Sequence, residues 1–556
     1  MTALHSNTWS PETTGLARYW LQKCSNEHTD CSRRVTRGID RDRSHLPTRT
    51  LQVQRTATGT IKARLRLTAD LPLDFCYLTL SHCWGLRPFL TLTQAAYDSF
   101  LEEIPTSDPN FNQCFNDAMQ VTVDLGYEYV WIDSLCIIQD SPGWADWVRE
   151  CPRVGHIYAN GDCNLSATGF PTGLGGMVAK RNAAVLAPCL VTIPGAGPVY
   201  VFEEGDPDEE STYPIISRGW VVQEHALIDF GITSGVVPVL QKNQKEKKLF
   251  AAVLNGLGDS DRTRGQEEDP QHIMLMEWYD WAQRVSGTRL TRYSDRLPAL
   301  SGLAAYLHPS MQSSYVAGHW EAELLMSLLW RPDVYAEAVA HEEFIAPSWS
   351  WISSLRPATF RFPVLGVAVA LTRIVSFAVT LSAEADPFGA VTDGALYLCG
   401  PVLKPAEMSL TEDDKTEYFV KLPGDWWIHI AVHPDNPGTW TLPCPIMNQK
   451  EPARPEAAEE ALAPASPSCW WPDSLHLLPL YSEPPFGICG LLLEKVGDGR
   501  SGGGAGDGGN VVRRVGTFQE IRFMHHHKAM AATGRPDADP GADAISSLPG
   551  WDFTVI

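Results

Sequence analysis

The sequence lacks an excess of positive charge. Among its 556 residues, 44 lysines and arginines stand against 66 aspartates and glutamates, which gives a formal net charge of -22. Such a chain repels phosphate backbones and anionic lipid surfaces unless a local basic patch overrides the total. A short mixed-charge run, "NQKEKK" at 243–248, is typical of a solvated segment. We therefore expect no nucleic-acid partner.

An export signal and a clean transmembrane run are also missing. The first residues, "MTALHSNTWSPETT", show no basic start followed by an apolar core. The most apolar run, "VLGVAVALTRIVSFAVTLSA" at 364–383, has the length to cross a bilayer, but Arg373 lies at its middle and β-branched residues are frequent. We interpret this run as two buried strands. The expectation is a cytoplasmic protein with no membrane span.

The 13 cysteines follow no disulfide framework, because their number is odd and their spacing is scattered. Reduced thiols are expected. Cys24, His28 and Cys31 offer three zinc ligands, but the sequence nearby supplies no fourth ligand for a tetrahedral site. We therefore predict a helix and turn with buried thiols there, and no metal.

Three familiar catalytic motifs are absent. The sequence contains no G-x-x-x-x-G-K-[ST] phosphate loop, no G-x-S-x-G elbow and no H-E-x-x-H helix. These absences argue against nucleoside triphosphate hydrolysis, serine esterase chemistry and zinc protease chemistry.

What is present predicts an α/β domain. "CYLTLSHCWG" (76–85) and "YVWIDSLCII" (129–138) have the composition of strands, and "FNQCFNDAMQVTVDLGYE" (111–128) between them has helical spacing. Strand, helix and strand in this order predict a parallel crossover with both faces of the sheet covered. A helix at 15–31 and a hairpin across "LPTRTLQVQ" and "IKARLRLTA" are expected before it.

The length predicts several packed units. A helix at 144–161 is interrupted by Pro152, a strand follows at 163–169, and a new helix opens at 217. The pattern is helical over 272–330 and strand-like from 346 onward. We predict four segments and two flexible loops: 1–69 with a helix and hairpin, 70–235 as the α/β domain, 236–345 as helical, 346–556 as β-rich, and loops at 451–468 and 497–510.

Polar residues gather where the two predicted strands end, at Ser81, His82, Cys83 and Trp84 and at Asp133, Ser134, Cys136 and Gln139. Parallel sheets bind ligands outside the carboxyl ends of their strands. Two interpretations stand side by side. Asp133 either contacts a ligand or fixes the following turn, and Cys136 either contacts a ligand or is a small buried hydrophobe.

"RGWVVQE" at 218–224 places Trp220 and Glu224 on one helix face, with Arg218 at the helix start. An aromatic wall raises the pKa of a neighbouring carboxylate and offers a stacking surface for a flat ring. That pair suits glycosyl-type cleavage, in which a carboxylate stabilises an oxocarbenium-like sugar. The alternative is a core Trp and a Glu paired with Arg218. Glu150 is a second carboxylate candidate, although its helix position favours a solvated face.

These blocks together resemble the fungal heterokaryon incompatibility (HET) domain. The likeness rests on "YLTLSHCWG" at 77–85, "YVWIDSLCIIQDSPGWADWVRECPRVGHIYANG" at 129–161 and "RGWVVQE" at 218–224, with flanking pieces such as "LTRYSDRLPALSGLA" and "APSWSW". The resemblance implies a cytosolic fungal protein that triggers or executes programmed cell death after non-self recognition.

The resemblance also implies a Toll/interleukin receptor-like, flavodoxin-like parallel sheet, whose enzymatic relatives cleave NAD at its glycosidic bond. Carried over, Glu224 is the catalytic carboxylate and Trp220 the stacking wall. The strand-end contacts to the ligand are Ser81 and Asp133. No cofactor is implied, because NAD is the substrate, and self-association on activation with an unknown recognition protein as partner is expected.

Two alternatives remain open. The domain acts as a non-enzymatic module that transmits recognition through homotypic contacts, or it is a thiol hydrolase that uses Cys136 and His82.

Overall fold

The computed structural model describes most of the chain, namely residues 7–27, 45–180, 189–193, 197–201, 213–227, 231–233 and 270–556, the last range without 334, 338–343, 355, 363–367, 385, 404–406, 411–416, 423–425, 436–468, 471–473, 484–486, 497–509 and 525–549. His28 and Cys31 of the zinc-like cluster lie outside the described residues. So do the predicted loop at 451–468 and all but the last residue of the one at 497–510.

The chain divides into two compact units. Unit 1 consists of Met1–Met274, Thr288–Thr291 and Pro298–Ser310, and unit 2 of Leu275–Gly287, Arg292–Leu297 and Met311–Ile556. The four segments predicted from the sequence stay a prediction.

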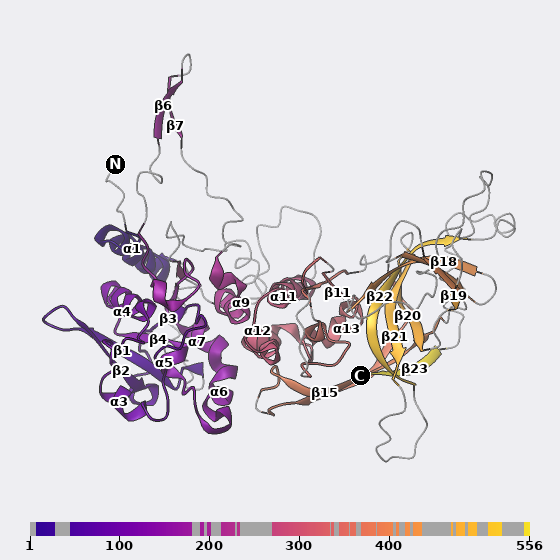
Figure 1. Cartoon of the computed structure of the whole chain (residues 1–556), viewed down its shortest axis with the longest axis horizontal. Coiled ribbons are helices and arrows are strands. Elements are labelled where there is room, and N and C mark those ends of the chain that lie inside the picture. Colours follow the sequence, from indigo (N-terminus) through magenta and orange to yellow (C-terminus); the bar gives the residue numbers. More distant parts are fainter. Residues whose placement is uncertain are drawn as a thin grey trace. The chain divides into compact units, whose positions relative to one another are not determined.

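Unit 1 is built on a mixed six-stranded sheet in the order β2-β1-β4-β3-β5-β8. Figure 1 shows strands β1 to β5 of this sheet among helices of the same unit. Strand β3 runs parallel to β4 and β5, and β8 runs parallel to β5. The hairpin β1–β2 joins this parallel part through an antiparallel β1–β4 pair. The predicted parallel crossover is therefore present, but the sheet as a whole is mixed. The strands are β1 (Arg49–Arg55), β2 (Ile61–Leu67), β3 (Leu78–Ser81), β4 (Tyr129–Trp131), β5 (Cys163–Ser166) and β8 (Gly231–Thr233).

Helices cover this sheet, and α4 packs on β1, β2 and β4. Helix α4 ends where Gly126 adopts the left-handed conformation (φ 93°) that glycine tolerates best. The predicted interruption at Pro152 is confirmed, because a 3₁₀ turn (Cys151–Arg153) separates α6 from α7. The helices are α1 (Pro11–Glu27), α3 (Tyr97–Glu102), α4 (Gln113–Leu125), α5 (Asp133–Cys136), α6 (Ala145–Glu150), α7 (Val154–Asn160), α9 (Gly219–Leu227) and α12 (Pro298–Met311). The hairpin β6 (Cys189–Ile193) and β7 (Gly197–Val201) also falls in this unit.

The strand predicted at 129–138 is shorter than expected. It ends at Trp131, and Asp133–Cys136 form the helical turn α5. Backbone hydrogen bonds from Leu135 and Cys136 to Ile132 O close this turn, so the chain turns away from the sheet directly after β4. This turn carries Asp133 at the carboxyl end of the strand.

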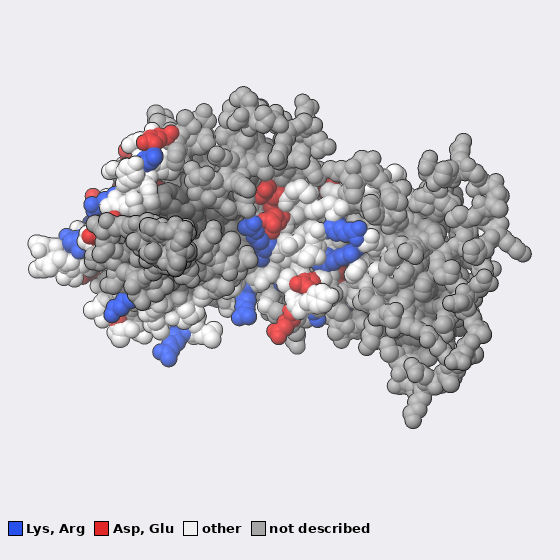
Figure 2. Space-filling model, turned by 90° about the horizontal axis from the view of Figure 1, so that it is seen from above, with Lys and Arg blue, Asp and Glu red and all other residues white. Residues whose placement is uncertain are grey.

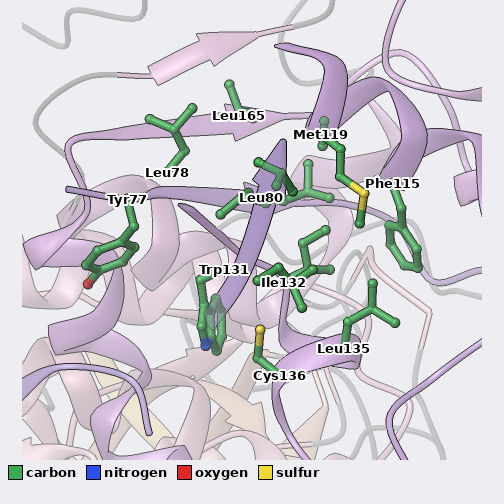
Figure 3. Close-up of a cluster of buried hydrophobic side chains, with 14 of the residues drawn as sticks. Tyr77, Leu78, Leu80, Phe115, Met119, Trp131, Ile132, Leu135, Cys136 and Leu165 are labelled. Carbon is green, nitrogen blue, oxygen red and sulfur yellow. The ribbon is translucent and has the colours of Figure 1, made fainter. Parts of the chain in front are cut away.

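The core of unit 1 lies around β3 and β4. Figure 3 shows the indole of Trp131 and the sulfur of Cys136 inside this cluster, with Leu135 beside them. Each fully buried large apolar side chain contributes about 1.5–3 kcal/mol relative to exposure. The labelled members are Tyr77, Leu78, Leu80, Phe115, Met119, Trp131, Ile132, Leu135, Cys136 and Leu165.

Unit 2 contains the β-rich part predicted from the sequence and most of α11, whereas α12 of the predicted helical segment falls in unit 1. Its main sheet has 11 described strands, in the order β13-β20-β21-β22-β18-β17-β16-β19, with β14, β15 and β23 joined through β22. The strands are β13 (Val369–Ala370), β14 (Arg373–Leu381), β15 (Val391–Pro401), β16 (Glu407–Leu410), β17 (Glu417–Leu422), β18 (Trp426–Pro434), β19 (Cys469–Trp470), β20 (Leu475–Glu483), β21 (Gly487–Lys495), β22 (Asn510–Met524) and β23 (Gly550–Val555). The remaining elements are α11 (Pro270–Ser286), α13 (Leu324–Ser327), β9 (Tyr315–Val316), β10 (His319–Trp320), β11 (Arg331–Pro332) and β12 (Ala358–Thr359).

The apolar run at 364–383 forms strands, as predicted, but they are not buried. Strand β13 is exposed, and every residue of β14 is exposed or half-buried, with Val375 52% exposed. The burial prediction is wrong because β14 is an edge strand that pairs with β15 alone among the described strands, and its residues are at most half-buried. In the described part of the chain, no helix is long and apolar enough to cross a membrane.

Charged side chains of both signs are interspersed over the described part of the face in Figure 2.

Candidate functional site

Polar side chains from three distant parts of the chain meet at the carboxyl edge of the parallel strands. Ser81 ends β3, and Asp133 follows β4. Arg218, just before α9, and Glu224 on α9 reach the same place, because the Arg218 guanidinium donates a hydrogen bond to the His82 carbonyl and the Ser81 side chain lowers the pKa of Glu224. The structure thus brings together residues that lie more than 130 positions apart.

Glu224 is the centre of this cluster. Its side chain is buried, and burial is the main cause that raises its pKa from 4.5 to about 7. Arg218 and the hydrogen bonds from Ser81 and Tyr158 lower the pKa, and the negative charge of Asp133 raises it. At neutral pH this carboxyl group therefore exists in both protonation states.

The geometry decides between the two interpretations of the Arg218–Glu224 pair. Within the described residues, no ion pair at 4.0 Å or less joins these two side chains, and Arg218 is bound to the His82 carbonyl instead. Burial outweighs the arginine in setting the pKa of Glu224. The carboxylate is consequently not neutralised by a direct partner, as an ordinary structural glutamate would be.

Two residues that the sequence patterns did not single out support Glu224. The Tyr158 hydroxyl on α7 donates a hydrogen bond to the Leu80 carbonyl oxygen at 3.2 Å, and the Tyr158 side chain lowers the pKa of Glu224. The Asn164 amide on β5 donates to Ser81 Oγ at 3.1 Å and accepts from Thr79 Oγ1 at 2.9 Å. Tyr158 lies in the second sequence block, but helical spacing alone makes it indistinguishable from a core aromatic.

Asp133 joins the first two sequence blocks. Its Oδ2 accepts a hydrogen bond from Trp84 Nε1 at 3.0 Å, and its Oδ1 accepts one from the backbone N–H of Ser134 at 2.6 Å. The His82 Nδ1 lies 3.9 Å from Oδ1. Burial lowers the pKa of His82 to about 4, so this histidine is neutral at physiological pH. Asp133 therefore both fixes the local turn and takes part in the cluster.

Several buried polar atoms in and beside this cluster have no hydrogen-bond partner among the residues that the structure describes. Buried polar groups are paired in the great majority of cases, so such a concentration marks a place where a ligand's polar groups would be satisfied. The atoms are Glu224 Oε2, His82 Nδ1, His82 Nε2, Ser134 Oγ, Thr168 Oγ1, Gln223 Nε2 and Gln223 Oε1.

Three other residues that were predicted to contact a ligand, Trp220, Gln139 and Cys136, make contacts outside the Glu224 cluster. Trp220 is half-buried and meets Trp147 edge to face, with ring centroids 5.9 Å apart. The Gln139 side-chain amide donates to the Ile137 carbonyl at 3.0 Å. Cys136 belongs to the apolar core, where burial raises its pKa to about 12, and no described contact joins it to His82. A thiol of this kind is a poor nucleophile.

The interpretation of Glu150 as a solvated residue is wrong. Its side chain is 1% exposed, and its carboxylate contacts the Thr48 backbone N–H at 3.3 Å and the guanidinium of Arg153 at 3.7 Å. Helix α6 turns this position inward because the segment before β1 packs against it. These contacts describe a buried ion-pair network that ties Thr48 to the helix.

The side chains of the cluster also bear on whether the domain holds a metal ion. Among the described residues, no group of three or more His, Cys, Asp or Glu side chains has the arrangement of a metal site.

Comparison with known proteins places this cluster in a family. Residues 77–224 match the family model "Heterokaryon incompatibility protein (HET)". No curated protein and no solved structure matches the chain. The matched range begins at Tyr77, just before β3, and ends at Glu224, so it contains all three sequence blocks of the cluster. Residues 77–224 of the chain therefore form a heterokaryon incompatibility (HET) domain.

Proposed function

We propose that the HET domain hydrolyses NAD at its nicotinamide glycosidic bond, with Glu224 as the catalytic carboxylate. The observation that carries this proposal is the state of Glu224, which is buried, has a pKa near neutrality and keeps one oxygen without a hydrogen-bond partner. A carboxylate of this kind can stabilise positive charge that develops on a ribose ring.

The order of the parallel strands supports a Toll/interleukin receptor-like, flavodoxin-like fold for the domain. Across the sheet, the parallel strands follow one another as β4, β3, β5 and β8. Numbered by their order along the chain, this is the strand order 2-1-3-4. Flavodoxin-like sheets have this order and bind ligands where it reverses, outside the carboxyl ends of the first and third strands. In this chain those strands are β3 and β5, beside Ser81 and Asn164.

The reaction balances without a cofactor. The bond between the ribose carbon and the nicotinamide nitrogen breaks, and its electron pair leaves with nicotinamide. A water oxygen bonds to the ribose carbon, which yields ADP-ribose and releases one proton. Ionised Glu224 stabilises the oxocarbenium-like transition state, and Asp133 and Ser81 position the nucleotide.

The test is nicotinamide release from NAD by the purified full chain. Glu224→Gln keeps the shape of the side chain and removes its charge, so we expect release to fall at least about 100-fold, the loss typical of removing one electrostatic stabiliser. Glu102→Gln, at an exposed glutamate of α3 in the same unit, is the matched control and should behave like the wild type. Release that survives Glu224→Gln contradicts the proposal.

We further propose that NAD loss executes programmed cell death in fungal non-self recognition, and that an unidentified recognition protein triggers it. If so, expression of the full chain in a fungal cell should be toxic, and Glu224→Gln should remove both the toxicity and the fall in cellular NAD. Toxicity that persists in the variant favours the non-enzymatic signalling module.

Self-association on activation has its own support. Trp144 and Val148 are each 45% exposed on the turn before α6 and on α6 itself. Exposed large apolar side chains close together mark contact surfaces in soluble proteins. Val148→Asp should therefore keep the fold and reduce oligomer formation, measured by light scattering of the full chain; an unchanged mass distribution would remove this surface from consideration.

A further inference from the structure

A pair of arginines in unit 2 shares a single neutral acceptor. Arg331 Nη2 on β11 and Arg361 Nη1 both donate hydrogen bonds to Gln519 Oε1 on β22. Because both donors reach the same oxygen, they lie within two hydrogen-bond lengths of each other, about 6 Å. Arg331 Nη1 also lies 2.9 Å from His433 Nε2 on β18. Two like charges are thus held together by amide and imidazole groups.

Neither cation is neutralised by an acid. In the part of the chain that the structure describes, no carboxylate lies within 4.0 Å of the Arg331 or Arg361 guanidinium. Arg331 Nε is buried and has no hydrogen-bond partner within the described residues. Burial, followed by the positive charges of Arg361 and Arg514, lowers the pKa of Arg331 to about 10.

The neighbouring Arg514 shows how the same sheet treats a structural arginine. Its guanidinium makes two hydrogen bonds of 2.9 Å to the carboxylate of Asp435 and stacks 3.6 Å above the ring of Trp330. Arg514 also donates to the backbone carbonyls of Leu328 and Trp330. Full pairing of this kind is the usual condition for burying a charge. The Arg331 and Arg361 pair lacks it.

We propose that Arg331 and Arg361 form a binding site for a small phosphate anion, free or carried as a monoester, with Gln519 at its base. Guanidinium groups match phosphate oxygens in bidentate geometry and remain charged at all physiological pH values. Arg361 is exposed, so an anion reaches it from solvent, and Arg331 is half-buried behind it. A bound phosphate supplies the negative charge that the described carboxylates do not supply.

The test is titration calorimetry of the full chain at constant ionic strength, with inorganic phosphate as one probe and phenyl phosphate as the other. We expect saturable binding of at least one probe, and the tighter of the two identifies whether the site accepts the free ion or the monoester. Arg361→Gln should weaken that binding at least about tenfold, because one charged hydrogen-bond donor is lost. Arg361 is exposed, so this variant should fold.

Two further variants make the result specific. Arg373→Gln changes the same charge at an exposed position of β14 and should bind like the wild type. Arg331→Lys keeps the charge but loses the planar fork, and should bind more weakly than the wild type. Equal binding by wild type and Arg361→Gln overturns the proposal. So does an equal loss in Arg373→Gln, or no saturable binding of either probe by the wild type.

Discussion

Glu224 is set apart from the other described glutamates by what surrounds it. Glu150, which is also buried, is held by Thr48 and Arg153, whereas Glu224 has one carboxylate oxygen with no hydrogen-bond partner among the described residues. A carboxylate oxygen of this kind is available to a bound ligand. This difference between two buried acids of one domain supports a catalytic role for one and a structural role for the other.

The first prediction concerns the pH dependence of nicotinamide release. Because the ionised form of Glu224 is the active one, the rate should rise with pH and reach half its maximum near pH 7. Arg218→Gln removes a charge that lowers this pKa and should move the midpoint upward, whereas Asp133→Asn should move it downward. Rates measured between pH 5 and pH 9 check the two directions. Shifts of the same sign in both variants would rule out this assignment.

A second prediction concerns stability. Glu224 has a raised pKa in the fold, so its contribution is fully present below pH 4.5 and is lost as pH rises through about 7. His82 has a lowered pKa, so its contribution is present above pH 6.5 and is lost as pH falls through about 4. Each amounts to about 3 kcal/mol, and between these limits the two oppose each other.

Substituting either Glu224 or His82 should leave the pH-dependent stability contribution of the other residue unopposed. Glu224→Gln should make unit 1 more stable with rising pH between 4 and 6.5, and His82→Phe should make it less stable between 4.5 and 7. Labelling of the buried thiols Cys114 and Cys136 in urea, followed by mass spectrometry, reports on unfolding of this unit. Identical pH profiles for both variants would contradict the burial of one of these groups.

The site residues show what a sequence pattern can and cannot give. Ser81, Asp133, Arg218 and Glu224 were predicted because they end strands or open a helix, and position in an element is a local property. Tyr158 and Asn164 were not, because their role depends on which side of α7 and β5 faces α9. The burial of Glu150 was missed for the same reason, since its partner Thr48 lies 102 positions away.

At the scale of elements, helices α7 and α12 approach each other closely. A Cβ added to Gly155 would lie 2.6 Å from Gly302 Cα, and one added to Gly302 would lie 2.7 Å from Gly155 Cα. Only glycine at both positions allows this distance. The Gln223 side chain, next to Glu224, lies at the same crossing, because its Oε1 would be 2.9 Å from a Cβ at Gly302.

The third prediction follows from this crossing. Gly302→Ala should destabilise unit 1 by about 1–3 kcal/mol, because the clash is with backbone atoms and requires a helix to move. Gly15→Ala, in α1 where a Cβ meets nothing within 4 Å, is the control and should be neutral or stabilising by up to about 1 kcal/mol. Urea unfolding with thiol labelling measures both. A neutral Gly302→Ala would mean that the helices are not in contact as described.

The positions of helices and strands were predicted better than the burial of their residues. The hairpin β1–β2 and helix α4 follow from alternation and helical spacing, which are properties of short windows. The end of β4 at Trp131 was missed, because an apolar run continues through a helical turn as easily as through a strand. The exposure of β14 could not be predicted, since it depends on strand order in a sheet assembled from distant segments.

At the scale of the whole molecule, the family match covers only part of unit 1. The hairpin β1–β2 precedes the matched range 77–224 and pairs with β4 inside it. Helix α12 follows the matched range and contacts α7. The folded unit that holds Glu224 is therefore larger than the recognised domain, and experiments on the site call for the full chain.

Unit 2 contributes a separate chemical feature, the Arg331 and Arg361 pair, which has no counterpart in the Glu224 cluster. The phosphate titration and the nicotinamide assay use different residues and different ligands. A negative result in the phosphate titration therefore does not affect the conclusion from the nicotinamide assay, and the reverse also holds.

The most direct measurement is nicotinamide release from NAD at pH 8, where Glu224 is ionised, by wild type, Glu224→Gln and Glu102→Gln full chains of matched folding. The proposed role of Glu224 predicts equal release by wild type and Glu102→Gln and at least about 100-fold less by Glu224→Gln. Equal release by all three proteins, or none from the wild type in its associated form, would contradict it.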